Sequence, residues 1–508
     1  MKKHLGKYGG IKVLLIAGVL LFAGSALQGQ ALLTVDRAME IAVEYSPDMQ
    51  QTELSLERSQ QRLNAQRARL KSQFAITLDP FEYEKTNRFD QQTGEWYVNE
   101  LASSGGTFSI NQRILPTDGQ LSLVNRFSYD YSFTESQYAG DPLSQTYNNR
   151  LYLQFTQPIF TYNRTRMETE RLELDYEASL INYLLMRLTL ERNVSQEFYA
   201  VYSSQMSLEI ARDDLTNNLE SYEIIRNKVE GGMLALEELY QAEVNLATSH
   251  SGVFNAELSL ANRKDQFKVL IGLPIDTTLM IAAEIIADTV PVNQELAISH
   301  ALANRMELRE REIDMQNANF DLIVAESTNE FAGSVSASFG VQGNNAQLSN
   351  LFDTPTNTPA VGLTLSIPLF DWGERKSEIK AAEASLKSTQ ISYEVEATNI
   401  VMNIRSVVRN LKNLENQIQI QQKTVENAEL AYDINLERYR NGDLTSLDLG
   451  LYQNQLSESK MALTNAIIDY KIELLNLKIQ SLYDFEKELP IIPEELHISD
   501  EKKKDKKR

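Results

Sequence analysis

The sequence predicts a fold of mixed α and β structure that is built from two structural repeats. The Gln-Pro-Ile-Phe segment at Pro158 returns as Ile-Pro-Leu-Phe at Pro368, and the glycine at Gly232 returns at the same offset as Gly442. The interval from the proline to the glycine is therefore identical in the two halves. A long helical pattern fills this interval, and short segments of alternating apolar and polar residues precede each proline. Because the repeat keeps its helix length, we interpret the halves as structurally equivalent.

The segment 1–31 is typical of a secretory leader. A basic start is followed by an apolar run at 13–23, which is too short to span a bilayer, and then by small residues. No later stretch approaches the roughly 18 apolar residues of a transmembrane helix. The chain has no cysteine, so we expect neither disulfides nor an acyl anchor on a leader cysteine. We therefore predict an exported protein with a signal peptide at 1–31.

The rest of the chain is predicted to form two repeats and a tail. We expect repeat one over 32–275, repeat two over 276–485 and a charged C-terminal tail over 486–508. Each repeat should hold a helix, a group of strands and a long helical hairpin, with strands within about 73–160 and 331–368 and hairpins at 166–271 and 374–484. The first repeat has about 49 additional residues in its strand region, and those around 105–135 contain Gly-Gly and Pro-Thr-Asp-Gly turn signals. They either add a hairpin to the strands or form an external loop.

The second hairpin carries two interleaved series of apolar residues seven positions apart. One series runs from Ile379 to Leu414 and the other from Ala397 to Tyr439. Such series form a heptad seam, which needs a partner helix along its whole length. A single helix over this segment would be about 100 Å long at about 1.5 Å per residue, longer than a globular core uses. An elongated coiled coil is therefore one interpretation.

The alternating segments argue against a coiled coil alone. Strict alternation occurs at 74–78, 127–133, 151–155, 335–341 and 361–367. The segment at 127–133 is rich in aromatic residues. Aromatic-rich alternation suits membrane strands, which face lipid on one side and a polar lumen on the other.

Each strand region is expected to end at a proline. Pro158 and Pro368 lack the N–H that a strand ladder needs, so each fits the last position of a strand. Asn163 and Gly373 follow at the fifth position after each proline, and both residue types tolerate a left-handed backbone. We interpret these pairs as strand-to-helix junctions.

The recurring glycines are expected to end the long helices. Gly232 and Gly442 would be helix C-caps, at which the chain turns back as a helical hairpin. The next residues would lie at the hairpin tips: Met233, Leu234, Asp443 and Leu444. An apolar residue on a tight turn either caps its own helix ends or offers a docking surface, and the sequence leaves both interpretations open.

Two carboxylates follow these glycines at matching positions, Glu238 and Asp448. In a symmetric oligomer each would form a ring of negative charge around the axis, able to select cations or pair with neighbours. Alternatively, Thr445 and Asp448 form a capping box at the start of the returning helix. The simpler interpretation of Tyr439 is a residue of the heptad seam, and the second interpretation is a hydrogen-bonding group.

The sequence offers no support for catalysis, a cofactor or a metal site. The four histidines are scattered without metal-ligand spacing, at His4, His250, His300 and His497. There is no phosphate-binding loop or nucleophile motif. The net charge of −21 argues against nucleic acid as a partner. We therefore predict a non-enzymatic protein.

Taken together, these features resemble the TolC-like outer membrane efflux protein family over about residues 32–484. The strand-end prolines, the turn at 438–448 and the segment 268–274 carry the resemblance through their order and spacing. The chain departs from well-known members at Leu444, where a basic residue can belong to the gate, and at Leu451, where a second acidic ring can lie.

The resemblance implies a homotrimer in the outer membrane of Gram-negative bacteria that extends into the periplasm. Each subunit would give strands to one antiparallel β-barrel, surrounded by outer membrane lipid, and helices to one long coiled-coil α-helical barrel. The implied function is the exit duct of a tripartite efflux or type I secretion system, which passively conducts substrates from an inner-membrane pump. Asp448, Glu238 and Tyr439 match the positions of the family's periplasmic gate, and the tips would dock a periplasmic adaptor protein. The alternative is an exported periplasmic coiled-coil spacer without a pore.

Overall fold

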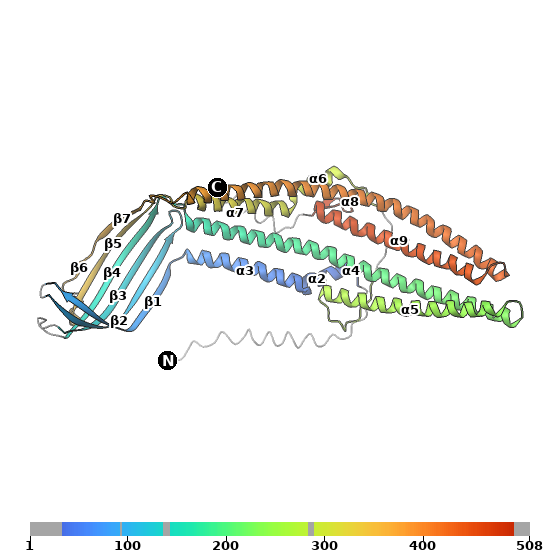
Figure 1. The fold of residues 1–508 in the computed structure, drawn as a ribbon, viewed down its shortest axis with the longest axis horizontal. Coiled ribbons are helices and arrows are strands. Elements are labelled where there is room, and N and C mark those ends of the chain that lie inside the picture. The colour runs from blue at the N-terminus through green and yellow to red at the C-terminus, as the bar shows by residue number, and fades with distance from the viewer. Residues whose placement is uncertain (1–32, 92–93, 136–142, 283–288, 492–508) are drawn as a thin grey trace, which may run out of the picture. The chain divides into compact units, whose positions relative to one another are not determined.

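The computed structural model describes residues 33–91, 94–135, 143–282 and 289–491, so the expected signal peptide and the last residues of the tail lie outside the described residues (Figure 1). The chain forms two compact units. One comprises residues 33–53, 183–305 and 398–491, and the other comprises 54–182 and 306–397. Each unit therefore draws on both halves of the sequence.

The described residues form eight α-helices and nine strands (Figure 1). The helices are α2 (Val35–Tyr45), α3 (Pro47–Arg69), α4 (Arg164–Glu230), α5 (Leu236–Ile271), α6 (Gln294–Asn304), α7 (Met306–Glu326), α8 (Glu374–Asn441) and α9 (Ser446–Ser481). The strands are β1 (Gln73–Asp90), β2 (Glu95–Ile114), β3 (Gly119–Glu135), β4 (Leu143–Ile159), β5 (Ala332–Asn345), β6 (Thr356–Asn357), β7 (Ala360–Ser366), β8 (Tyr483–Asp484) and β9 (Leu489–Pro490).

The long helices confirm the helical segments that the sequence predicts. α4 has 67 residues and α8 has 68, and each is followed by a returning helix of 36 residues. The heptad seam of α8 is buried at Ile404, Leu411 and Ile418. The sequence did not predict the breaks after Tyr45 and Asn304. These breaks occupy corresponding positions in the two halves, and each follows a helix of 11 residues.

All strands except β8 and β9 form one antiparallel sheet in the order β1-β2-β3-β4-β5, with β6 and β7 both paired to β5. β6 and β7 share one register on β5, because Val341 pairs with Asn357 and Ser338 pairs with Ala360. They therefore act as one strand, interrupted where Pro359 cannot donate a hydrogen bond. Within the described residues, the outer edges of β1 and of the β6–β7 strand have no partner.

The register sorts the side chains of this sheet onto two chemically different faces, because directly opposite residues of an antiparallel ladder lie on the same face. One face is mainly apolar and includes Phe74, Ile76, Leu78, Phe108, Ile110, Leu121, Leu123, Leu151, Leu153, Phe155, Phe339, Val341, Val361, Leu363 and Leu365. The other is mainly polar and includes Thr77, Thr107, Ser109, Ser122, Arg126, Ser128, Asn148, Arg150, Gln154, Ser336, Ser338, Gln342 and Thr364.

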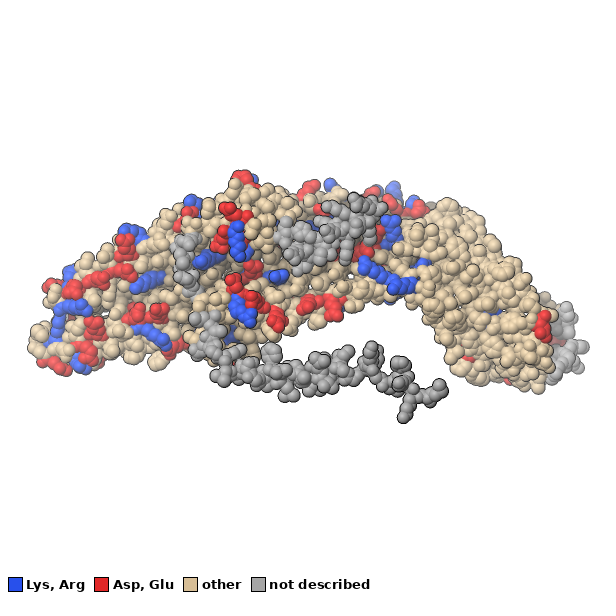
Figure 2. All heavy atoms as spheres, turned by 180° about the vertical axis from the view of Figure 1, so that it is seen from behind, with Lys and Arg blue, Asp and Glu red and all other residues tan. Residues whose placement is uncertain are grey.

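The described part of the chain leaves the side chains of the apolar face largely exposed. Ile76 is 70% exposed and Val361 is 84% exposed. Figure 2 shows one side of the molecule on which charged residues cover the helices and are almost absent over the strands. A sheet in water would cover such a face, so these side chains need an apolar neighbour from outside the chain.

The additional residues of the first half form part of the sheet, which decides between the two alternatives left open by the sequence. β2 and β3 pair along their whole length around a tight turn at 115–118. The expectation of a turn at Gly105 and Gly106 was wrong, because both lie in the middle of β2. A Cβ atom on Gly105 would lie 2.7 Å from the carbonyl oxygen of Phe127, so a close approach between strands accounts for the glycine.

The β2–β3 turn also forms hydrogen bonds with the start of α4. Asp118 accepts hydrogen bonds from the backbone N–H groups of Arg164 (3.3 Å) and Thr165 (3.2 Å). The amide of Asn163 donates to the carbonyl oxygen of Leu115 at 2.6 Å. A carboxylate at a helix N-terminus is stabilising, because it satisfies free N–H groups and opposes the positive end of the helix dipole.

The strand-to-helix junctions follow the prediction only in part. Pro158 lies at the end of β4 as expected, whereas β7 ends at Ser366, before Pro368 is reached. Gly373 has the expected left-handed backbone with φ of 87°, but Asn163 does not, and the left-handed residue of the first junction is Phe160. Asn163 instead caps α4, since its side-chain oxygen accepts from the N–H of Arg166 at 2.8 Å.

The C-terminal tail begins later than the sequence predicts. The tail was expected to begin at 486, but Leu489–Pro490 pairs with Tyr483–Asp484 in a small sheet. A core of α2, α4 and α5 residues, with Phe198 and Phe267 fully buried, anchors the first half of the chain. Among the described residues, no helix is both long and apolar enough to cross a membrane.

Candidate functional site

The two hairpin tips are built by the same backbone motif. At the end of α4, the N–H of Gly232 donates to Val229 (2.9 Å) and the N–H of Met233 donates to Lys228 (2.8 Å). At the end of α8, Gly442 and Asp443 make the corresponding bonds to Tyr439 and Arg438 at 3.0 and 2.9 Å. Both glycines have positive φ, of 71° and 89°. These bonds are those of the Schellman motif, and they confirm the helix C-caps that the sequence predicts.

A small hydrophobic core lies beneath the two tips. Tyr439 is only 5% exposed and packs with Ile225 and Leu449, and Leu234 and Leu444 pack against the same cluster. These two leucines therefore cap their own hairpins, one of the two interpretations that the sequence left open. Met233 differs, since its side chain is 71% exposed.

Polar contacts link the two hairpins next to this core. The ammonium of Lys228 on α4 donates to the carbonyl oxygens of Arg440 (2.9 Å) and Tyr439 (3.4 Å) at the end of α8. A guanidinium nitrogen of Arg440 lies 2.9 Å from a carboxylate oxygen of Glu220 on α4. The positive charge of Lys228 thus lies at the negative end of the dipole of α8 and satisfies carbonyl groups that the helix leaves free.

The three predicted gate residues line one pocket at the tips. Glu238, Tyr439 and Asp448 share this pocket with Lys228 and Asp443. Burial of the phenol and the negative charge of Glu238 raise the pKa of Tyr439 well above its ordinary value, so its hydroxyl is neutral. The repeat related Glu238 to Asp448, and the resemblance to the family added Tyr439 to this set.

Asp448 also has the structural role that was weighed against the gate. The hydroxyl of Thr445 donates to its carboxylate at 2.7 Å, and the N–H of Asp448 donates back to that hydroxyl at 3.2 Å. Thr445 is thus the N-cap of α9, and Asp448 holds its hydroxyl in place. Asp448 is half-buried, so its carboxylate serves the cap and borders the pocket at once.

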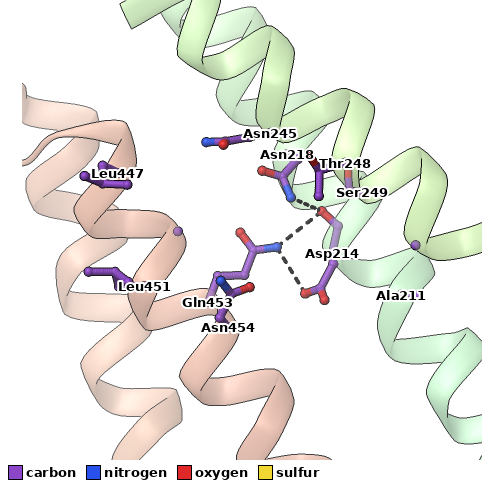
Figure 3. Close-up of a pocket in the computed structure, with 12 residues that line it drawn as sticks. Ala211, Asp214, Asn218, Asn245, Thr248, Ser249, Leu447, Leu451, Gln453 and Asn454 are labelled. Carbon is purple, nitrogen blue, oxygen red and sulfur yellow. Dashed lines mark hydrogen bonds between the residues drawn. The ribbon is translucent and has the colours of Figure 1, made fainter.

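A second pocket, lined by α4, α5 and α9, lies further along the same hairpins (Figure 3). The Gln453 amide donates to the Oδ1 (3.1 Å) and backbone O (3.2 Å) atoms of Asp214, and the Ser457 hydroxyl donates to Oδ1 at 2.8 Å. Asp214 therefore ties α4 to α9. The rest of the wall is formed by small and amide side chains, including Asn218 and Asn245, and by the apolar side chains of Leu447 and Leu451.

Sequence reasoning missed Lys228, Asp214 and Asp118. Lys228 carries a weak signal, because a cation in the last turn of a helix complements its dipole. Asp118 stands in a recognised turn signal, but its distant partner on α4 cannot be read from that signal. Asp214 is one acid among many on a long helix, and nothing in the sequence distinguishes it.

The returning helices carry apolar side chains that the described part of the chain leaves largely exposed. On α5, Leu236, Tyr240 and Val244 follow one another at intervals of four and are each more than half exposed. On α9, Leu447 and Leu451 are exposed in the same way. This spacing places each set on one helix face. No grouping of histidine and carboxylate side chains in the described part of the chain could hold a metal ion.

A sheet with one apolar and one polar face, on a chain with two long helical hairpins, is the architecture of outer membrane channels with long helical extensions. The sequence pattern of the outer membrane efflux protein family matches residues 126–273 and 297–479, which is more than half of the chain. The chain belongs to this family, whose members are components of transport rather than enzymes.

Individual relatives are distant. The probable outer membrane lipoprotein SilC of Salmonella typhimurium is 21% identical over 343 residues, which cover 66% of this chain and 73% of that protein. The cation efflux system protein CusC of Escherichia coli K12 is 22% identical over 290 residues, which cover 55% of this chain and only 62% of that protein. The fold resembles the crystal structure of CusC (TM-score 0.65, 15% identity, 90% and 95% of the two chains). It also resembles the Campylobacter jejuni CmeC outer membrane channel (TM-score 0.65, 16% identity, 90% of each chain).

Proposed function

We propose that three copies of this chain form an exit duct through the outer membrane and into the periplasm. The duct conducts substrates passively from an inner-membrane pump, with which a periplasmic adaptor connects it. Relatives named for the efflux of cations, antibiotics and solvents belong to one family, so the proposal concerns the duct and not its cargo.

The observation that carries the proposal is the two-faced sheet with unpaired edges. In a membrane, backbone groups at a sheet edge must find partners, and a closed barrel is the way to provide them. β1 and the β6–β7 strand run in opposite directions, so the edge of one copy can pair with the edge of the next in an antiparallel ladder. Closure of a ring of copies would thus use every edge.

The chemistry of the faces supports an assignment of inside and outside. Arg126 and Arg150 lie near the middle of β3 and β4 on the polar face. An arginine facing lipid at the bilayer midplane costs roughly 2–4 kcal/mol. The polar face therefore lines the lumen and the apolar face meets outer membrane lipid.

The helices support a homotrimer in the same way. The exposed apolar faces of α5 and α9 would be covered by neighbouring copies, which together form a helical barrel. Three copies bring three pairs of hairpin tips around one axis, with Glu238, Tyr439 and Asp448 at each pair. We propose that these residues form the periplasmic gate.

The outer side of the same tips would dock the adaptor. The residues concerned are those of the two turns: Gly232, Met233, Leu234, Gly442, Asp443 and Leu444. Of their apolar side chains, Met233 alone is largely exposed, so it is the one we expect to contact the adaptor directly.

Single-channel conductance in planar bilayers tests the proposal. We expect a small, steady conductance from the purified wild type and a larger one from Asp448→Asn and Tyr439→Phe. Asp448→Asn keeps an acceptor for Thr445, so a change reports the charge rather than the cap. Asp433→Asn is the matched control, because Asp433 is an exposed acid on α8 outside the tip pocket.

Each alternative has its own outcome. A large conductance in the wild type would keep the duct and remove the gate. Protein that stays soluble without detergent and never inserts would overturn the duct in favour of a periplasmic spacer.

A further inference from the structure

The polar face of the sheet carries a pair of arginines in direct opposition. Arg126 on β3 pairs with Arg150 on β4, so both side chains leave the sheet on the same face and next to each other. The row continues through Thr107 on β2 and Gln342 on β5, which are uncharged hydrogen-bonding residues. Both arginines lie near the middle of their 17-residue strands.

Like charges directly opposite on a sheet are destabilising. In the part of the chain that the structure describes, neither guanidinium has a carboxylate within ion-pair distance. Arg150 instead lies over the ring of Tyr152, with its central carbon 5.0 Å from the ring centroid. This contact orients the guanidinium but leaves its charge uncompensated.

The nearest acids on this face do not neutralise the pair. Asp130 lies further along β3 than Arg126, and its carboxylate accepts from Asn148 at 2.7 Å and Ser128 at 3.3 Å. Asp79 on β1 pairs with Gly105 and forms no ion pair among the described residues. The arginine pair is therefore a local basic site on a face that is otherwise made largely of hydroxyl and amide groups.

We propose that Arg126 and Arg150 bind the anionic groups of passing solutes, such as carboxylate, phosphate or sulfate, and give this section of the lumen a preference for anions. The inference rests on the proposed duct, in which three copies would place three such pairs around the lumen. Rings of arginine side chains select anions in pores, and a forked guanidinium matches the geometry of carboxylate and phosphate. The cost of opposing two arginines is then offset whenever an anion lies between them.

The test is the reversal potential of the full-length protein in planar bilayers under a KCl gradient. We expect the permeability ratio of chloride to potassium to fall roughly threefold to tenfold in the double variant Arg126→Gln/Arg150→Gln at about 0.1 M salt. The double variant Arg126→Lys/Arg150→Lys keeps both charges and should keep the ratio. The difference should shrink near 1 M salt, where the Debye length is only about 3 Å.

Block by sodium tripolyphosphate gives a second measurement, and its first result comes from the wild type alone. This polyanion should reduce wild-type conductance, and the block should be lost in the glutamine variant and weaker in the lysine variant, since lysine cannot bind in the bidentate way. Channels whose ion preference is unchanged in the glutamine variant, or wild-type channels that tripolyphosphate does not block, would overturn the arginine site and leave the duct intact. A wild type that forms no channel at all would overturn the duct and the arginine site together.

Discussion

Lys228 offers a direct measure of what holds the two hairpin tips together. Its ammonium bridges from α4 to the carbonyl oxygens of Arg440 and Tyr439 at the end of α8. Lys228→Met keeps an unbranched apolar side chain and removes the charge, its hydrogen bonds and the cation–π contact of the ammonium with the Tyr439 ring. We expect the tip to open more often while the rest of the molecule is unchanged.

The magnitude follows from the contacts that are lost. A cation at a helix C-terminus contributes about 0.3–1 kcal/mol. A hydrogen bond from a charged donor contributes about 1.5–3 kcal/mol, and the half-buried position of Lys228 places it near the lower limit. A net loss of about 1–2 kcal/mol raises the open population of the tip by roughly 5- to 30-fold.

Hydrogen–deuterium exchange measures this opening directly, because amide exchange reports local unfolding. Peptides covering 221–245 and 430–450 should exchange faster in Lys228→Met, and peptides from the sheet should not change. Lys412→Met is the matched control, since Lys412 is also on the surface of a long helix and its one ion pair among the described residues is with Glu415 on the same helix. Tip exchange that rises by less than about twofold would refute the reasoning, because it corresponds to less than about 0.4 kcal/mol.

Three further predictions concern single positions. Gly272→Ala should lower the thermal stability more than Gly442→Ala does. Both glycines have positive φ, but a Cβ on Gly272 would lie 2.2 Å from a backbone oxygen, whereas Gly442 has open space. Equal losses of stability would contradict this. Asp118→Ala should cost about 1–2 kcal/mol in denaturant unfolding and Asp118→Asn clearly less, since asparagine tolerates the left-handed backbone and still accepts hydrogen bonds from α4. The raised pKa of Tyr439 gives stability that is fully present below the ordinary tyrosine pKa of about 10 and is lost as pH rises above it. Amide exchange at the tips, corrected for its intrinsic pH dependence, should therefore become faster above pH 10 in the wild type. The increase should be smaller in Tyr439→Phe.

The parts of the fold that depend on local chemistry and periodicity were predictable from the sequence. The left-handed backbone that commonly ends a helix favours glycine, so Gly232 and Gly442 could be assigned as C-caps from the sequence. The heptad series of α8 defined its buried seam in the same way. Alternation identified strands in both halves, because the side-chain period of a strand is two.

The parts that depend on pairing between distant segments were not predictable. Gly105 and Gly106 have the composition of a turn, but the close approach of a neighbouring strand keeps them in mid-strand. The residue type at Asn163 permits a left-handed backbone and also permits a helix cap, and the backbone of the junction selects the cap. Lys228 and its carbonyl partners belong to different halves of the sequence, so only the folded chain brings them together.

The extra length of the first half follows from the way in which a ring of copies would close. A ring of identical chains joins the last strand of one copy to the first strand of the next, and the pair is antiparallel only when each copy has an even number of strands. With β6 and β7 counted as one, the sheet has six strands, and β2 and β3 enter it together as one hairpin. A single added strand would instead leave parallel neighbours at each junction between copies.

The additional segment of the first repeat is therefore long enough for two strands and a turn, which is the smallest insertion that widens such a ring and keeps it antiparallel. On this argument, removal of residues 95–135 should leave a narrower ring that still closes, whereas removal of β3 alone should prevent closure, and detergent-stable trimers on native gels would distinguish the two.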